Sequence, residues 1–399
     1  MDKIAFVVLW LLIFSTAWEE MAEVPGVGRI SRLIGMMAFL VGLVAVLAAR
    51  RFRPPALFHG AIALFVCWSA ATVYWSIDPE SSVRMSFTYA QLLLLVWLIW
   101  EFAPDERRQR GLLQAYVLGA YLSAGLTIAL FATSSMPLGR YAASGYNAND
   151  LGFTLVLALP MAWYLALVDA RGPMAWLNRL YLPIGTLAVF LTGSRGAAIP
   201  AAVALTLIPW TLTRPPPRVR LVLAGLIIGS VFFLHAFVPP AAVERLSTIP
   251  LEIRGGSFSS RAEIWHAGWE VLQRHPLAGR GAGAYAEAVA PHLGIARSAH
   301  QSFLAVLVGQ GLIGFTLFMA VFATALLPIL RLPPLERKFW AVLTLTLVIG
   351  MMPRTWDYRK PTWLVLGVLT AHAATLAGTA DGRRARGHEP EPAWVYPGG

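Results

Sequence analysis

Long apolar runs alternate with short polar segments along most of the chain. A helix needs about 20 mostly apolar residues to cross the hydrocarbon core of a membrane. We therefore interpret each run as a membrane-spanning helix, although a short run could instead be re-entrant. The runs occupy residues 4–18, 33–49, 57–75, 87–102, 112–131, 151–168, 177–191, 197–212, 221–237, 302–330, 339–351 and 362–376. This pattern predicts an all-α polytopic membrane protein with about twelve transmembrane helices.

One polar interval is much longer than the others and separates the ninth run from the tenth. It covers residues 238–299 and is rich in arginine, histidine and glycine, which a simple connection between spans would not need. We predict a membrane domain over residues 1–377, with this loop inserted into it. The polar segment 378–399 is predicted to be a disordered tail, because it offers too little apolar surface to form a core.

Arginine and lysine are distributed unevenly between the two sides of the predicted membrane domain. If the N-terminus is cytoplasmic, the connections on that side are basic, including segments 50–53, 107–110, 214–220 and 331–338. Short loops with an excess of arginine and lysine stay in the cytoplasm. The sequence thus predicts that both termini are cytoplasmic and that the long loop faces outward.

The composition supports a membrane location and excludes several other classes of protein. Hydrophobic residues make up 57% and charged residues only 13%, whereas about 25% of a typical soluble domain is charged. The net charge of +11 would suggest nucleic-acid binding in a soluble protein, but the basic cytoplasmic loops account for most of it here. We expect no nucleic-acid partner. The single Cys67 excludes a disulfide framework, and Glu19-Glu20-Met21 after the first run predicts an uncleaved span.

Polar motifs precede the even-numbered spans six, eight and ten, whose N-termini should all lie at the outer face. These motifs contain Asn147 and Asn149, then Ser194-Arg195, then His300-Gln301. A helix N-terminus carries partial positive charge and free N–H donors. A cation such as Arg195 is disfavoured there unless an anion is bound nearby. The alternative is an arginine that only extends to the membrane interface.

A second arginine, Arg261, lies at the predicted start of a helix in the long loop. Ser260 and Glu263 form the S-x-x-E pattern of a capping box. An amphipathic stripe suited to the membrane surface follows at Trp265, Gly268, Trp269 and Leu272. Arg261 lies on the same stripe, which favours contact with a phosphate or pyrophosphate headgroup that its planar fork can bind. A simple interfacial anchor remains the alternative.

His300 lies where the long loop re-enters the membrane, at a helix N-terminus that should lower its pKa and keep it neutral. A neutral imidazole there could act as a base, although most interfacial histidines have no such role. His275 precedes Pro276, where a helix must end. The Gly279–Gly283 glycine run resembles a phosphate-binding loop only superficially, since no strand precedes it, and a tight turn is the favoured interpretation.

No metal-binding motif is found in the predicted outer loops. They contain no H-x-x-x-H, no Asp-x-Asp and no cysteine pair. Asp150, Glu263 and Asp357 could hold Mg²⁺ but are isolated in the sequence. Negative charge that develops on a leaving pyrophosphate would then have to be stabilised by arginines and helix N-termini.

Five motifs occur together in one order between residues 145 and 312. They are Asn147-Ala148-Asn149-Asp150-Leu151-Gly152, Leu191-Thr192-Gly193-Ser194-Arg195-Gly196, Ser260-Arg261-x-x-Ile264-Trp265, His275-Pro276-Leu277-x-Gly279-x-Gly281-x-Gly283 and Ala299-His300-x-x-Phe303-Leu304. None is decisive alone, but the set resembles the O-antigen ligase and polymerase superfamily. The resemblance implies a C-type glycosyltransferase-like membrane fold in the bacterial inner membrane, with a large periplasmic loop between spans nine and ten.

The same resemblance implies a chemistry and its residues. The donor would be a glycan linked to undecaprenyl pyrophosphate, and neither a metal nor another cofactor would be needed. Arg195 and Arg261 would hold the donor pyrophosphate, and His300 would activate the acceptor hydroxyl. The motifs also suggest four substrate-binding residues: Asn147, Asn149, Arg280 and Gln301. Gln301 departs from the asparagine that often follows this histidine, which leaves the acceptor side open.

Three functions remain in competition. The first is a ligase that moves the glycan to the lipid A–core oligosaccharide with inversion at the anomeric carbon. The second is a polymerase of O-antigen or exopolysaccharide, or a relative that glycosylates protein. The third is a transporter of lipid-linked sugars, which should carry ionisable groups at mid-membrane depth. Only His372 is placed so deeply, and the other polar clusters lie at the outer edge. We therefore favour a transferase, and among transferases the ligase.

Overall fold

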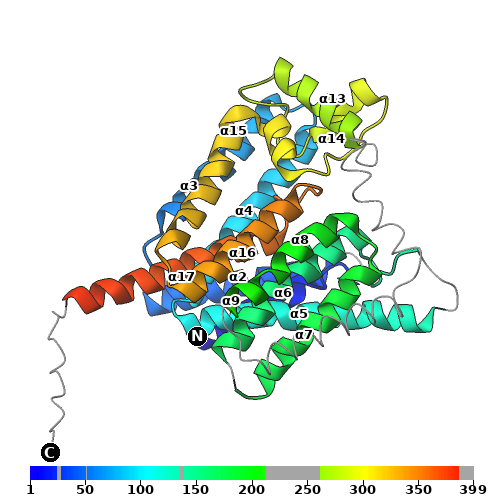
Figure 1. Ribbon diagram of the computed structural model, residues 1–399. Coiled ribbons are helices and arrows are strands. Elements are labelled where there is room, and N and C mark those ends of the chain that lie inside the picture. The colour runs from blue at the N-terminus through cyan, green and yellow to red at the C-terminus, as the bar shows by residue number, and fades with distance from the viewer. Residues whose placement is uncertain (25–27, 51, 135–138, 170, 213–260, 386–399) are drawn as a thin grey trace, which may run out of the picture.

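The computed structural model describes residues 1–24, 28–50, 52–134, 139–169, 171–212 and 261–385, and almost all of their regular structure is helical (Figure 1). The helices up to the long loop are α1 Asp2–Thr16, α2 Ile30–Ala49, α3 Leu57–Ala71, η1 Thr72–Trp75, α4 Pro79–Phe102, α5 Glu106–Thr133, α6 Ala148–Val168, α7 Pro173–Leu191, α8 Arg195–Leu205 and α9 Leu207–Thr211. Those after it are α13 Arg261–Arg274, α14 Tyr285–Leu293, α15 Ser302–Leu326, η3 Leu327–Arg331, α16 Pro334–Met351 and α17 Lys360–Ala385. The prediction of a mainly helical membrane protein is confirmed.

A short antiparallel pair of strands is the one departure from an all-α fold among the described residues. Strand β1, Glu23–Val24, pairs with β2, Gly28–Arg29, in the connection between α1 and α2. The pair aligns Glu23 with Arg29 and Val24 with Gly28. Two residues per strand carry too little periodicity to be predicted from sequence.

Eight helical segments of the described chain are long and apolar enough to cross a membrane, so the count of twelve is not confirmed. They are Ile30–Ala49, Leu57–Trp75, Pro79–Phe102, Glu106–Thr133, Ala148–Val168, Pro173–Leu191, Ser302–Arg331 and Lys360–Gly378. Of the other predicted spans, α1 has only 15 residues and α16 has 18, while the eighth is divided into α8 and α9. At 1.5 Å per residue, α1 is shorter than the roughly 30 Å hydrocarbon core. The ninth run and Ser260 lie outside the described residues.

Helix caps extend two spans beyond their apolar runs. Helix α4 begins at Pro79 rather than at residue 87, because Asp78 caps it by accepting from the Ser81 N–H and proline suits the first helical position. Helix α5 begins at Glu106 rather than at residue 112, with Asp105 as its cap. At the other end of the chain, α17 continues to Ala385. The predicted tail is therefore helical over 378–385, since a helix propagates easily once a buried span has nucleated it.

Two groups of helices pack side by side. Helix α6 is buried along nearly its whole length and packs against α5, α7, α8 and α16. The other group consists of α3, α4, α15 and α17. Helices α13 and α14 lie across the end of the molecule where α15 begins and where α3 ends, at the top of Figure 1. We call this end of the molecule the site end.

The apolar face of α13 packs against protein rather than being left for a membrane surface. Its buried residues include Ile264, Gly268 and Leu272, which pack together with α14 and α15. Gly268 is required, because a Cβ there would lie 2.4 Å from the Tyr285 hydroxyl. Of the predicted stripe, Trp269 is the residue that stays largely exposed, at 52%. The membrane-surface interpretation of this helix is corrected accordingly.

The glycine run forms a tight turn, as the sequence predicts. Gly279 and Gly281 have positive φ angles of 68° and 113°. A Cβ on Gly279 would lie 2.5 Å from the backbone nitrogen of Gly311, where α15 is kinked. The Arg280 and Gly281 N–H groups donate to the carbonyls of Val308 and Gly309. Since these amides are already used, the run is a tight turn packed closely against the kink of α15 and not a phosphate-binding loop.

Candidate active site

Three helix N-termini meet at the site end around one loop, residues 352–359, which follows α16. The Ser302 hydroxyl at the start of α15 donates to the Arg354 carbonyl at 2.7 Å and accepts from the Trp356 N–H at 2.8 Å. Ser194, which precedes α8, donates to the Asn149 side-chain oxygen at the start of α6 at 3.0 Å. The N-termini of the sixth, eighth and tenth predicted spans therefore lie close together. The partial positive charges of three helix ends are thereby brought together.

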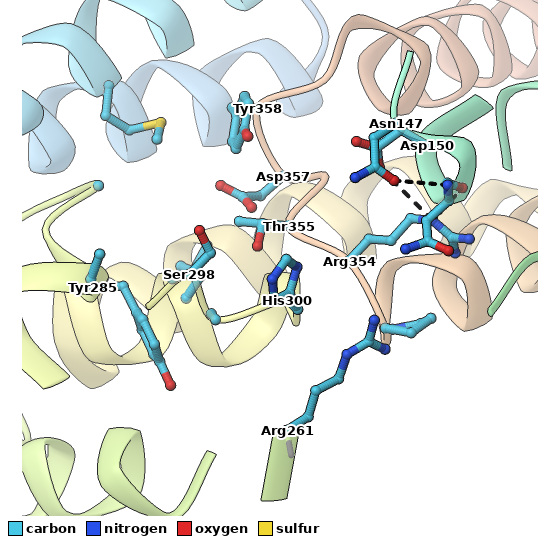
Figure 2. A pocket seen from close by; sticks show the side chains of 18 of the residues that line it. Asn147, Asp150, Arg261, Tyr285, Ser298, His300, Arg354, Thr355, Asp357 and Tyr358 are labelled. Atoms are coloured by element: carbon cyan, nitrogen blue, oxygen red, sulfur yellow. Dashed lines mark hydrogen bonds and ion pairs between the residues drawn. The ribbon is translucent and has the colours of Figure 1, made fainter. Parts of the chain in front are cut away.

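A cavity of about 260 Å³ lies at this junction (Figure 2). Its wall contains residues from α4, α6, α13, α14, α15 and the 352–359 loop. They are Met85, Tyr89, Asn147, Asn149, Asp150, Arg261, Gly283, Tyr285, Ala286, Ser298, Ala299, His300, Ala305, Val306, Gln310, Pro353, Arg354, Thr355, Asp357 and Tyr358. The volume is near the lower limit of ordinary ligand sites, about 300 Å³. It therefore suits a reacting group better than a whole glycan.

Arg354 is the most buried cation of the cavity, only 3% exposed. Its guanidinium donates to the carbonyls of Asn149 (3.0 Å), Gly196 (3.1 Å) and Gly350 (3.1 Å) and to the Ser194 hydroxyl (3.3 Å). These contacts tie the starts of α6 and α8 to the end of α16. Burial lowers the pKa of Arg354 to about 9, which still leaves the group charged at neutral pH.

Asp150 provides the negative charge nearest to Arg354. Its carboxylate lies 4.0 Å from the Arg354 guanidinium and 3.5 Å from that of Arg359, and it accepts from the Trp356 indole N–H at 2.8 Å. Arg359 also pairs with Glu20. Asp150 is thus engaged by arginines. In the described part of the chain, no three His, Cys, Asp or Glu side chains are grouped closely enough to hold a metal ion.

His300 lies at the mouth of the cavity in a strained backbone conformation. Its φ of 46° is left-handed, which is uncommon for a residue other than glycine and costs roughly 1–3 kcal/mol. The neighbouring residues hold it: the Trp265 indole donates to the Ala299 carbonyl at 2.9 Å, and Gln301 caps α15. Trp265 of the predicted stripe therefore positions this loop.

The environment of His300 favours the neutral imidazole. Partial burial of the ring lowers the pKa of His300 below its ordinary value of 6.5, and the charge of Arg261 lowers it further, while Asp150 opposes the shift. The predicted direction is confirmed, but burial and Arg261 are its main causes, where the sequence suggested the helix N-terminus. In Figure 2 the Arg261 side chain extends from the start of α13 toward His300 and Arg354.

Asp357 is a second candidate for contact with the substrate. The sequence alone indicates it only as a possible metal ligand. It is 2% exposed and accepts a hydrogen bond from the Tyr89 hydroxyl, while its Oδ1 has no hydrogen-bond partner among the described residues. Burial raises the pKa of Asp357 to about 6, against the effect of the Tyr89 hydrogen bond. A buried acceptor without a partner is costly. A sugar hydroxyl in the cavity could donate to it.

Four of the seven predicted site residues line the cavity, namely Arg261, His300, Asn147 and Asn149. Both asparagine side-chain oxygens are already used within the protein: that of Asn147 caps α6 through the Asn149 N–H, and that of Asn149 accepts from Arg140 and Ser194. Their predicted role in substrate binding would therefore depend on the NH₂ groups of their side chains.

The other three predicted site residues are not part of the cavity wall. Arg195 is the first residue of α8, and the side chain that reaches the cavity beside it is Arg354. Arg280 lies within the glycine turn, and its backbone N–H and carbonyl hydrogen-bond Val308 and Ile77. Gln301 is used as the cap of α15 by accepting from the Leu304 N–H. The functional roles expected for Arg195, Arg280 and Gln301 stay predictions, and Arg354 is an additional cation that lines the cavity.

Sequence reasoning did not identify Arg354 or Tyr89 as residues of this cavity, and it considered Asp357 only as a possible metal ligand. Arg354 lies 205 residues from Asn149 and 158 from Gly196, so no local motif connects them. One signal was present: the 352–359 loop carries several charges between two apolar runs at the predicted outer face.

Comparison with known protein families gives one match. Residues 180–319 match the family described as O-antigen ligase. The matched region contains Arg195, Arg261 and His300 and ends before Arg354. None of the curated proteins matches the chain. The family match confirms the resemblance to the O-antigen ligase and polymerase superfamily.

Proposed function

We propose that this chain, which carries an O-antigen ligase domain, is a glycosyltransferase of the ligase type. It would move a glycan from undecaprenyl pyrophosphate to the lipid A–core oligosaccharide at the periplasmic face of the bacterial inner membrane. The observation that supports this most strongly is a cavity in which a neutral histidine lies beside two arginines and three helix N-termini. Both termini would be cytoplasmic, as the basic loops predict.

In this proposal Arg261 and Arg354 stabilise the leaving pyrophosphate. Arg354 supplies a fixed buried charge in the cavity wall, and Arg261 supplies a guanidinium on a half-buried side chain that also lines the cavity. Positive groups that are already oriented stabilise developing negative charge without reorganisation. Because protein groups supply this charge, we propose no metal cofactor.

His300 would act as the general base. Its neutral imidazole takes the proton of an acceptor hydroxyl while that oxygen attacks the anomeric carbon of the donor sugar. The bond from the anomeric carbon to the pyrophosphate oxygen breaks on the opposite side, so the configuration inverts. The free Oδ1 of Asp357 would accept from a sugar hydroxyl and orient the ring.

The proposal is tested by direct transfer in a purified system. Protein in lipid nanodiscs should move glycan from undecaprenyl pyrophosphate to lipid A–core as fast in excess EDTA as with added Mg²⁺, measured by gel mobility of the product. Extension of glycan that remains on undecaprenyl pyrophosphate would instead identify a polymerase, and glycan attached to protein would identify a protein glycosyltransferase. If EDTA stops transfer and Mg²⁺ restores it, Asp150 and Asp357 become metal-ligand candidates and the arginine mechanism is wrong.

The pH dependence of glycan transfer should follow the protonation state of His300. A base works in its neutral form, so activity is lost as the pH falls through the pKa of His300, which lies below 6.5. Replacement of the exposed Arg297 by glutamine should move the acidic limb of kcat/KM upward, because the Arg297 charge helps to lower that pKa. The difference should shrink at high salt, which screens exposed charges.

Asp357 provides the control, since its pKa of about 6 falls in the same range. Asp357→Asn should reduce the rate but leave the acidic limb in place. If the acidic limb of the kcat/KM profile disappears in Asp357→Asn and does not move in Arg297→Gln, the group that titrates is Asp357 and not His300.

A further inference from the structure

Arg140 lies beside the candidate active site without lining its cavity. It belongs to the segment between α5 and α6, and its guanidinium makes two directed hydrogen bonds. Its Nε donates to the Thr192 carbonyl at the end of α7 at 3.0 Å, and its Nη2 donates to the Asn149 side-chain oxygen at 2.7 Å. The next residue, Tyr141, donates its backbone N–H to the Leu191 carbonyl at 2.9 Å. The guanidinium and the backbone beside it are therefore held against α7.

Two donors fix the orientation of the Asn149 carboxamide. Its oxygen accepts from Arg140 and, at 3.0 Å, from the Ser194 hydroxyl. A guanidinium can only donate, so the carboxamide atom that faces it must be the oxygen and not the nitrogen. Ser194 is oriented as well, because its oxygen accepts from Arg354 at 3.3 Å and its hydrogen is left for Asn149. The carboxamide cannot turn over without losing both hydrogen bonds.

The NH₂ group is the part of the Asn149 side chain that is left for a ligand. Asn149 lines the cavity, and this NH₂ group donates to no described residue. The backbone carbonyl of Asn149 accepts from Nε of Arg354 at 3.0 Å, so a second cation lies close to it. The cavity wall therefore carries an oriented neutral donor beside two arginines. An anionic oxygen fits this setting better than a sugar hydroxyl does.

We propose that Arg140 is a positioning residue that holds the Asn149 carboxamide so that its NH₂ group donates to the pyrophosphate of the lipid-linked donor. This inference rests on the proposed transferase function. Arg140 does not touch the substrate and acts through Asn149. A donor that is already oriented stabilises the charge that develops on the leaving group without reorganisation. The direction of one amide thus connects an arginine outside the cavity to the strength of donor binding.

Asn149→Asp separates the binding role of this side chain from its structural role. The carboxylate keeps the shape and an acceptor for Arg140 and Ser194, and negative charge is favourable at a helix start. The thermal unfolding midpoint should therefore be at least that of the wild type. The variant lacks the NH₂ donor, so its Kd for undecaprenyl pyrophosphate in nanodiscs should rise at least about tenfold, the effect of losing one hydrogen bond to a charged group. Wild-type affinity in this variant would overturn the proposal.

A double-mutant cycle tests whether Arg140 acts through Asn149. Arg140→Ala should raise the same Kd about tenfold in the wild type and have little further effect in Asn149→Ala, where the carboxamide that it orients is absent. Equal losses in both backgrounds would show that Arg140 acts by its charge or by stabilising the fold, and the positioning role would be wrong. Arg84→Ala is the matched control. Arg84 is 63% exposed and does not line the cavity, so its loss should leave the Kd unchanged.

The choice of lipid identifies the group that Asn149 contacts. Undecaprenyl pyrophosphate carries no sugar, so weaker binding of this lipid by Asn149→Asp assigns the contact to the pyrophosphate. If affinity is lost only for the glycan-linked donor, Asn149 contacts a sugar and the pyrophosphate assignment is wrong. If the wild-type protein binds neither lipid, the proposed transferase function is itself wrong.

Discussion

His300→Ala should lower the turnover of glycan transfer by about two to four orders of magnitude, the usual range for loss of a general base. A sugar hydroxyl is a poor nucleophile near neutral pH, and imidazole titrates in the range where a base is most effective. His300 lines the cavity, and burial together with Arg261 keeps its ring neutral. The measurement is kcat in the nanodisc assay, together with binding of undecaprenyl pyrophosphate.

Donor binding should survive in His300→Ala, because Arg261 and Arg354 remain. His266, His275 and His292 lie in the same region of the chain without lining the cavity, and alanine at each should cost far less. Wild-type turnover in His300→Ala would show that His300 is not the base and only lies at the membrane interface. Loss of donor binding equal to that in an arginine variant would make it part of the anion site rather than the base.

The backbone of His300 adds a constraint to this experiment. A residue with φ of 46° is less strained as glycine or asparagine than as alanine. His300→Asn should therefore fold at least as well as His300→Ala while lacking the base. Equal losses of turnover in the two variants would separate the chemistry of the imidazole from the conformation of the loop.

The membrane helices could be predicted because their signal is local. A run such as that of α2 is apolar on nearly every side, so composition alone identifies it. The starts of α4 and α5 were placed too late because hydropathy does not register caps, although Asp78-Pro79 and Asp105-Glu106 carry this information. For α1, α8 and α9 the apolar run predicted a complete span, but the helix is short or interrupted. An apolar run does not determine the length or the continuity of the helix that it forms.

The candidate site could be predicted only where its residues lie in short motifs. Arg261 and His300 were identified from their positions at helix starts, and both line the cavity. Arg195 begins α8 but is not among the residues that line the cavity, because the direction of a side chain at a helix start depends on packing. Tyr89 and Asp357 are 268 residues apart, and such a pair appears only once α4 and the 352–359 loop are brought together.

Trp265 shows why an amphipathic pattern alone is ambiguous. The spacing of Trp265, Gly268 and Leu272 predicts an apolar face correctly, but it does not tell what covers that face. Here α14 and α15 cover it, and the Trp265 indole makes a specific hydrogen bond to Ala299. A stripe of this kind can therefore position a loop beside a candidate site as readily as it can contact a membrane.

Arg354→Ala should abolish transfer and also destabilise the protein, whereas Arg261→Ala should abolish transfer alone. Loss of one oriented donor to a developing anion costs about 10²–10³ in kcat, and we expect at least this for both variants. Arg354 is buried and connects α6, α8 and α16 through four hydrogen bonds. Removing a buried charge from its partners typically costs roughly 3–5 kcal/mol. The measurements are kcat and the thermal unfolding midpoint in detergent.

Lysine substitutions complete this comparison. A single ammonium cannot reproduce the planar fork that reaches Asn149, Gly196, Gly350 and Ser194 together, so Arg354→Lys should recover neither stability nor transfer. Arg261→Lys keeps a charge at the cavity mouth and should recover a small part of the rate. If Arg354→Ala unfolds at the wild-type temperature and still transfers glycan, then Arg354 neither connects the three helices energetically nor stabilises the pyrophosphate. If it is stable but inactive, its charge acts on the substrate and its hydrogen bonds contribute little to stability.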